Sequence, residues 1–166
     1  MLLCEVLPIL LRRLAFPSSR EAIRIECVKQ TPGETVMNET LAAWAPRALS
    51  VLRIFTGLEL LDHGLAKLFG FPVVPSFANI QINSLLGASG VIELIGGLLL
   101  TIGLFTRPVA FILSGFAAVG YFMTHAPRAF YPVVNGGDYV ALLCFVALYL
   151  ACAGGGPWSA DAMMRK

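Results

Sequence analysis

The chain has 166 residues, of which 57% are hydrophobic and 13% charged, and its formal net charge is +2. Soluble domains carry about 25% charged residues, so this composition excludes an ordinary soluble protein and indicates an integral membrane protein. The small net charge, without basic runs interleaved with aromatic residues, argues against nucleic-acid binding. The length suits one domain with about four spans, and we expect an all-α, integral membrane four-helix bundle in contact with the lipid bilayer.

The N-terminal residues 1–40 differ from the rest because they carry many charged side chains and no apolar run long enough to cross a bilayer. A more ordinary membrane-protein start follows at Met37. Two interpretations stay open for this region. It is either a gene-start extension that ends before Met37 or a short amphipathic or disordered cytoplasmic arm.

Four apolar segments follow in chain order. Pro46 is well placed in the first turn of the first segment, because proline lacks the N–H group that a first turn leaves unused. Glycine and proline residues separate the segments, which is typical of helix ends. A polar connection covers residues 71–84, and a tight turn covers residues 106–108. The predicted spans cover residues 47–69, 85–105, 108–125 and 139–153.

Basic residues predict the orientation. They gather near the start of the first span, at the turn after the second span and at the C-terminus, and include Arg47, Arg53, Arg107 and Arg165. The positive-inside rule then places both termini in the cytoplasm. We therefore expect a multi-pass protein of the bacterial cytoplasmic (inner) membrane.

A polar stripe lies on the first span. Glu59, His63 and Lys67 are spaced four residues apart and share one helix face, and Asp62 lies on the shoulder of that face. A charged group at the bilayer centre costs about 2.5 to 3.5 kcal/mol on insertion scales. The stripe is therefore expected to face partner helices rather than lipid.

The same topology brings further polar residues to the outer half of the bundle. Glu93 on the second span and His125 at the end of the third would join the stripe. The remaining candidates are Tyr121, Arg128, Asn135 and Asp138. Ionisable residues inside a membrane are functional-site hypotheses by default. A structural role is the alternative: Glu93 would pair with Lys67 or His63, and Asp138 would only cap a helix.

Three chemistries fit such a cluster. A metal site is disfavoured, because di-iron bundles need a Glu-x-x-His pair on two helices, and here Glu59 and His63 are four apart without a second copy. A proton-coupled transporter would use the carboxylates and histidines as a relay, but four spans without an internal repeat would need a homo-oligomer.

The third chemistry is a polar pocket for a quinone head group or another small ligand with a polar head. His63 and His125 would exchange protons with the ligand, Glu93 would set their charge state, and Lys67 would stabilise an anionic form. This hypothesis makes His63, Glu93 and His125 the catalytic candidates. The ligand-binding candidates are Glu59, Asp62, Lys67, Tyr121, Arg128, Asn135 and Asp138. The sequence has no recognisable haem or nucleotide motif.

Several separate motifs stand out between residues 46 and 162. They are residues 52–53, 63–70, 93–100, 103–107, 121–122, 125–132 and 135–137. Together these motifs resemble those of the DoxX (DoxD-like) family of small bacterial membrane proteins. Asp138 stands where members of that family often have glutamate.

The resemblance implies a four-span protein associated with redox systems. Members have been linked to thiosulfate:quinone oxidoreductase, to terminal oxidases, and to thiol and oxidative-stress complexes with soluble partner enzymes. It implies a quinone-linked subunit or a partner of another oxidoreductase. A non-catalytic scaffold that recruits a soluble redox enzyme is the main alternative.

Overall fold

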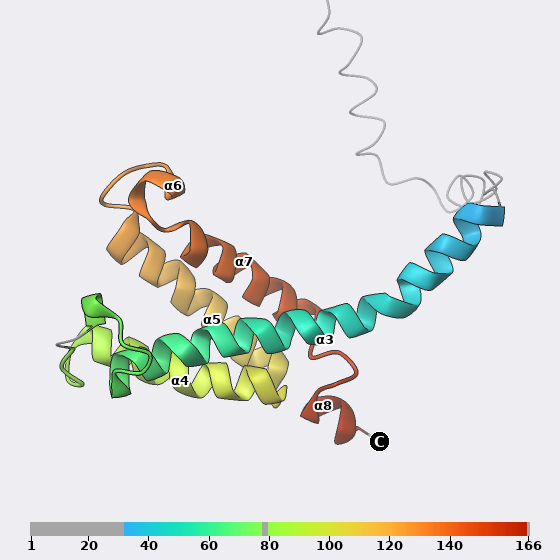
Figure 1. The fold of residues 1–166 in the computed structure, drawn as a ribbon, viewed down its shortest axis with the longest axis horizontal. Coiled ribbons are helices and arrows are strands. Elements are labelled where there is room, and N and C mark those ends of the chain that lie inside the picture. The colour runs from blue at the N-terminus through green and yellow to red at the C-terminus, as the bar shows by residue number, and fades with distance from the viewer. Residues whose placement is uncertain (1–31, 78–79, 166) are drawn as a thin grey trace, which may run out of the picture. The chain divides into compact units, whose positions relative to one another are not determined.

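The computed structural model describes residues 32–77 and 80–165, which are helical or in short connections and include no β-strand. The chain divides into two compact units, Met1–Leu41 and Ala42–Lys166. Within the second unit, Figure 1 shows α4 (Leu85–Ile102), α5 (Thr106–Gly120) and α7 (Asp138–Ala153) beside one another. The predicted arm and the Met37 start remain predictions, and residues 1–31 lie outside the described residues.

Helix α3 is much longer than the first predicted span. It covers Pro32–Phe69, 38 residues, with Pro46 inside it. The expectation that the helix begins around Pro46 is therefore wrong. The preceding residues are mostly Ala, Leu, Glu and Thr, which continue a helix upstream, and Pro32 takes the favourable first position instead. One turn after Pro46, the Ser50 hydroxyl donates a hydrogen bond of 3.2 Å to the Pro46 carbonyl.

Helix α4, Leu85–Ile102, has a clear signal at each end. The Ser84 hydroxyl accepts a hydrogen bond from the Gly87 N–H at 3.0 Å, which satisfies one of the free donors of the first turn. Gly103 ends the helix in the left-handed conformation with φ 75°. The predicted second span therefore ran three residues too far. A short 3₁₀ helix, η1 (Pro75–Phe77), lies in the connection before α4.

The remaining helices follow the prediction closely. Helix α5 covers Thr106–Gly120 and continues into a π-helical segment, η2 (Tyr121–His125). The short α6 covers Pro132–Asn135, α7 covers Asp138–Ala153 and α8 covers Ala160–Met163. Asp138 does not cap α7, because Gly137 occupies the cap position and its N–H donates to the Asn135 side chain at 2.8 Å. That detail of the prediction is wrong.

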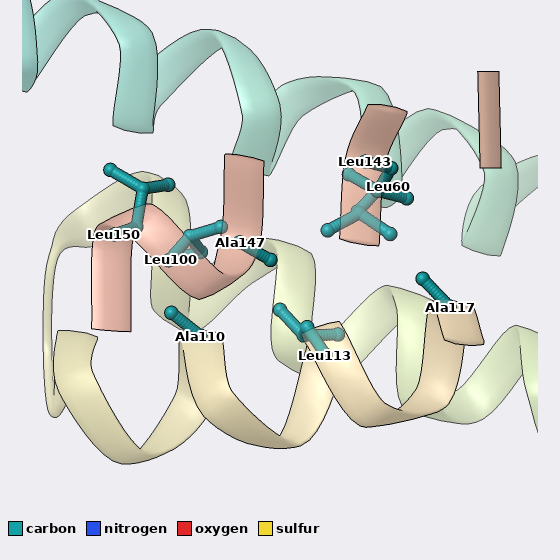
Figure 2. Close-up of a cluster of buried hydrophobic side chains, with 8 residues drawn as sticks. All are labelled: Leu60, Leu100, Ala110, Leu113, Ala117, Leu143, Ala147 and Leu150. Carbon is teal, nitrogen blue, oxygen red and sulfur yellow. The ribbon is translucent and has the colours of Figure 1, made fainter. Parts of the chain in front are cut away.

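The core is small and aliphatic, and four helices contribute to it. In Figure 2 the eight buried side chains point toward one another from α3, α4, α5 and α7. They are Leu60, Leu100, Ala110, Leu113, Ala117, Leu143, Ala147 and Leu150. Alanine at three of these positions lets α5 and α7 approach closely, as is common between helices in membranes.

The outer faces of the helices are apolar as well. Among the described residues, two helices are long and apolar enough to cross a membrane, Leu85–Ile102 and Thr106–His125, and only 33% and 28% of their apolar windows are buried inside the protein. The core helix of a soluble protein would be mostly buried. Large exposed side chains such as Phe55, Phe111 and Phe145 extend this apolar surface to α3 and α7. Lipid is the environment that such surfaces fit.

Glycines bring α3 and α4 into close contact. A Cβ atom added to Gly64 would lie 2.5 Å from the backbone nitrogen of Leu94. A Cβ atom added to Gly97 would lie 2.5 Å from the backbone nitrogen of Leu61. Small residues of this kind let two backbones approach in a membrane. This contact fixes the register of α3 against α4, and with it the position of Lys67 opposite Glu93.

Candidate functional site

An ion pair between α3 and α4 forms the centre of the candidate site. Lys67 Nζ lies 2.6 Å from Glu93 Oε1 and donates to the Ser89 hydroxyl at 3.1 Å. Both charged side chains are only 9% exposed. Of the two partners that the sequence suggested for Glu93, the structure shows Lys67. The polar stripe of α3 thus faces a neighbouring helix at this position.

The second oxygen of Glu93 has no hydrogen-bond partner in the part of the chain that the structure describes. Among the described residues, Glu93 Oε2 is buried and accepts no hydrogen bond. Buried polar atoms are almost always hydrogen-bonded, and an unpaired one costs about 1 to 3 kcal/mol, more when it is charged. The Lys67–Glu93 pair therefore leaves one strong acceptor available inside the protein.

His63 links the pair to α7 through a ring contact. Its ring stacks on Tyr139, with centroids 5.4 Å apart and an angle of 9° between the planes. His63 Nδ1 lies 2.9 Å from the Glu59 carbonyl oxygen, so Nδ1 carries the proton in this bond and Nε2 is left as an acceptor. The Tyr139 hydroxyl is within electrostatic range of the Glu59 and Glu93 carboxylates.

We call this set the α3–α4–α7 cluster. Its members are Glu59, His63, Lys67, Ser89, Glu93 and Tyr139. Ser89 and Tyr139 were not among the residues that the sequence pointed to. Tyr139 directly follows Asp138, which the sequence analysis named as a candidate. The position of Tyr139 in the first turn of α7 is the feature of the sequence that could have indicated it.

A second group, the loop cluster, joins the end of α5 to the start of α7. The Tyr121 and His125 rings stack at 6.2 Å, and His125 Nδ1 lies 3.2 Å from the Asn135 carbonyl oxygen. The Asn135 amide donates to the Tyr121 hydroxyl at 3.2 Å and to the Ala129 carbonyl at 2.8 Å. Asn135 is buried, and Tyr121 and His125 lie in the π-helical η2, a feature common at functional sites.

The structure thus divides the predicted site residues into groups. Seven of the ten lie in the α3–α4–α7 cluster or the loop cluster. The other three, Asp62, Arg128 and Asp138, are exposed, and within the described residues their side chains form no hydrogen bond or ion pair. No set of three or more His, Cys, Asp or Glu side chains in the described part could hold a metal ion.

Another buried charged side chain, Arg53, lies at the ends of the helices opposite to the α3–α4–α7 cluster. Arg53 is fully buried and donates from Nε to the Gly155 carbonyl at 2.9 Å and from Nη2 to the Trp158 carbonyl at 2.7 Å. Its Nη1 donates to the carbonyls of Leu100 and Thr101 in the last turn of α4. A cation there complements the helix dipole. The sequence located Arg53 near the inner end but did not predict this role.

Comparison with known proteins agrees with this architecture. The family model DoxX matches residues 48–126, which include α4, α5 and the part of α3 that carries the polar stripe. The chain belongs to the DoxX family, a family of membrane proteins. The resemblance that the sequence motifs indicated is therefore confirmed.

Two relatives show how far the similarity extends. A protein of Haemophilus influenzae, named only as uncharacterized, is 37% identical over 130 residues, which cover 76% of this chain and 97% of that protein. A Bacillus subtilis protein that bears the name Putative oxidoreductase CatD is 32% identical over 106 residues, covering 63% of this chain and 77% of the relative. No solved structure matches the chain at a significant level.

Proposed function

We propose that this protein is a membrane subunit of a redox system and that its α3–α4–α7 cluster binds a quinone-type head group. Family membership and the oxidoreductase name of the Bacillus subtilis relative support the redox association. The chain would lie in the bacterial cytoplasmic membrane with four spans and both termini inside. Electrons would pass to or from a partner oxidoreductase, because the sequence carries no haem or nucleotide motif.

The observation that carries the proposal is the unpaired Glu93 Oε2 beside Lys67. A quinol hydroxyl donates a hydrogen bond to such an oxygen, and a lysine ammonium stabilises a quinol anion. In the neutral His63 ring Nε2 is a second acceptor, and histidine is a common general acid or base in catalysis. The planar His63–Tyr139 stack supplies an aromatic surface beside these groups.

A second candidate function is a scaffold for a soluble redox enzyme. The observation that favours it is the apolar loop around α6, where Phe130 is 87% exposed and Val133 is 79% exposed. The loop cluster holds this segment through Asn135. Under this alternative, polar substitutions at Phe130 and Val133 would abolish co-purification of a partner, and changes at Glu93 would not.

Quinone binding tests the main proposal. The full-length protein, reconstituted in lipid nanodiscs, is titrated with a water-soluble ubiquinone or menaquinone analogue while intrinsic tryptophan fluorescence is recorded. We expect Glu93→Gln and His63→Ala each to weaken binding about tenfold or more, the effect of losing one hydrogen bond to a charged group. Native mass spectrometry of the wild type would report quinone that stays bound through purification.

Asp62→Asn provides the matched control, because Asp62 precedes His63 in the chain but is exposed and unpaired within the described residues. It should bind the quinone as the wild type does. The proposal fails if Glu93→Gln retains full affinity, or if all three variants lose it equally while remaining folded.

A further inference from the structure

A partly enclosed hollow of about 250 Å³ lies at the opposite ends of α5 and α7 from the α3–α4–α7 cluster. The glycine loop 154–156 forms one part of its wall, and Arg107 and Arg165 contribute two guanidinium groups. This volume is below the roughly 300 to 1,000 Å³ of typical sites for drug-sized ligands. The hollow therefore suits a small group.

The charges in the hollow are not balanced. Arg107 Nε lies 3.4 Å from the position that a Cβ atom on Gly154 would occupy, so its guanidinium lies against the loop. Within the described part of the chain, neither Arg107 nor Arg165 makes a hydrogen bond or a close ion pair. Asp161 is the acidic residue of the wall, and its two oxygens accept bonds of 2.8 Å from the N–H groups of Phe105 and Thr106. Asp161 thus accepts hydrogen bonds from the start of α5. Because the wall has two arginines and one acidic residue, a net positive charge remains in the hollow.

The loop offers donors but few acceptors. The carbonyl of Gly155 accepts from Arg53 and that of Gly156 accepts from the Ser159 hydroxyl, so both oxygens are occupied. Over the described residues, no acceptor is found for the N–H groups of Gly155 and Gly156. Arg53 also fixes the loop in place, which reduces the ordering cost of binding. Unused N–H groups beside two guanidinium groups fit an anion with several oxygen atoms.

We propose that this hollow binds a phosphate group, either in the head group of an anionic phospholipid or as free phosphate. Arg107 and Arg165 would each donate to phosphate oxygens, and the glycine N–H groups would take the remaining positions. The basic residues at this end predict that it faces the cytoplasm, where anionic lipid is abundant. The site is separate from the proposed quinone site and does not depend on it.

The test uses the full-length protein in an uncharged detergent. Thermal unfolding is recorded while one arm is titrated with short-chain phosphatidylglycerol and the other with inorganic phosphate. Arg107→Gln and Arg165→Gln should each weaken binding of the phosphate-bearing probe about tenfold, the usual effect of one charge-assisted hydrogen bond. Arg47→Gln is the matched control, because Arg47 is exposed near the same predicted end but lies over the Trp44 ring, 5.0 Å from its centroid, outside the hollow.

The arms separate the two sources of phosphate. Saturable binding of phosphatidylglycerol alone, lost in Arg107→Gln and kept in Arg47→Gln, supports a lipid head-group site. Binding of inorganic phosphate with the same dependence on Arg107 supports a free-phosphate site. The proposal is overturned if neither probe binds, or if Arg47→Gln weakens binding as much as Arg107→Gln, since general surface charge would then explain the affinity.

Discussion

Two buried charged side chains, Arg53 and Glu93, differ in how completely the surrounding helices supply them with hydrogen-bond partners. Arg53 is fully buried and donates four hydrogen bonds, all to backbone carbonyls. Glu93 is almost as buried, yet one of its oxygens is paired with Lys67 and the other has no partner among the described residues. One charge is satisfied by the fold itself, and the other is satisfied only in part.

This difference suggests how to separate structure from function in a membrane protein with few charges. A network that uses nearly all the donors of its central residue rigidifies the fold and leaves no bond for a ligand. A network with an unused buried acceptor is unfavourable in isolation, and binding a donor would relieve that cost. We therefore interpret the Arg53 network as structural and the Glu93 region as the binding site, and four variants test this interpretation.

The largest effect is expected for Arg53→Met. The substitution keeps an apolar stem but removes the side-chain donor of the Thr101, Gly155 and Trp158 carbonyls. We expect a loss of about 3 to 5 kcal/mol in the free energy of unfolding, because buried acceptors would become unsatisfied. Heating in detergent followed by size-exclusion chromatography measures this as a lower temperature of aggregation.

Arg128→Met is the control for Arg53, since Arg128 is exposed and its side chain is unpaired within the described residues. Its effect on unfolding should stay within about 0.5 kcal/mol. If the two variants were equally stable, the Arg53 network would not be the structural element that we infer.

The next effect concerns the close contact that aligns Lys67 with Glu93. An Ala side chain at Gly64 would place Cβ 2.5 Å from the Leu94 nitrogen, so Gly64→Ala forces α3 and α4 apart. Overpacking of this kind costs about 1 to 3 kcal/mol. Gly115→Ala is the matched control, because a Cβ there meets nothing within 4 Å. It should be neutral or raise the unfolding temperature, as alanine is the better helix former.

A smaller effect is expected at Asp161, which lies at the same end of the helices as Arg53. Burial would raise the pKa of Asp161, but hydrogen bonds from Thr106 and Phe105 and the charge of Arg165 outweigh it and hold the pKa below its ordinary value of 3.8. Asp161→Asn should cost about 1 kcal/mol at neutral pH. Because the folded-state pKa is depressed, this contribution is present above about pH 4 and is lost as the pH falls further. Melting curves of both proteins over a series of decreasing pH values should therefore show the stability difference shrinking once the pH falls below about 4.

The helices were predictable from the sequence where apolar length and end signals agreed. Leu85 and Ala153 were predicted as boundaries of α4 and α7, and both are confirmed. The predicted start of α3 was wrong because a proline is compatible with the first turn of a helix. The residues before Pro46 were also interpreted as a separate segment, since many of them are charged. Helix propensity upstream outweighed the missing N–H group.

The candidate site was predictable in its first-span stripe and in Glu93, which the sequence suggested as a partner of Lys67. Four-residue spacing placed His63 and Lys67 on one inward face, and Lys67 does meet Glu93. The spacing could not exclude Asp62, since a helical wheel gives a direction but not the position of the neighbouring helix. Tyr139 and Arg53 needed the structure, because the His63–Tyr139 contact joins residues 76 positions apart and the Arg53–Gly155 contact joins residues 102 positions apart.

The smallest effect on stability is expected for the double variant Lys67→Met/Glu93→Leu. It replaces a buried ion pair by apolar side chains of similar volume, which is often neutral or stabilising because both charges no longer need to be desolvated. Each single variant should be less stable than the double, since it leaves one buried charge alone. The double variant should fold and insert normally but fail to bind the quinone analogue, as measured by the same fluorescence titration. A double variant that unfolds as readily as Arg53→Met would instead show that Lys67 and Glu93 hold the helices together, and the contrast between the two charges would disappear.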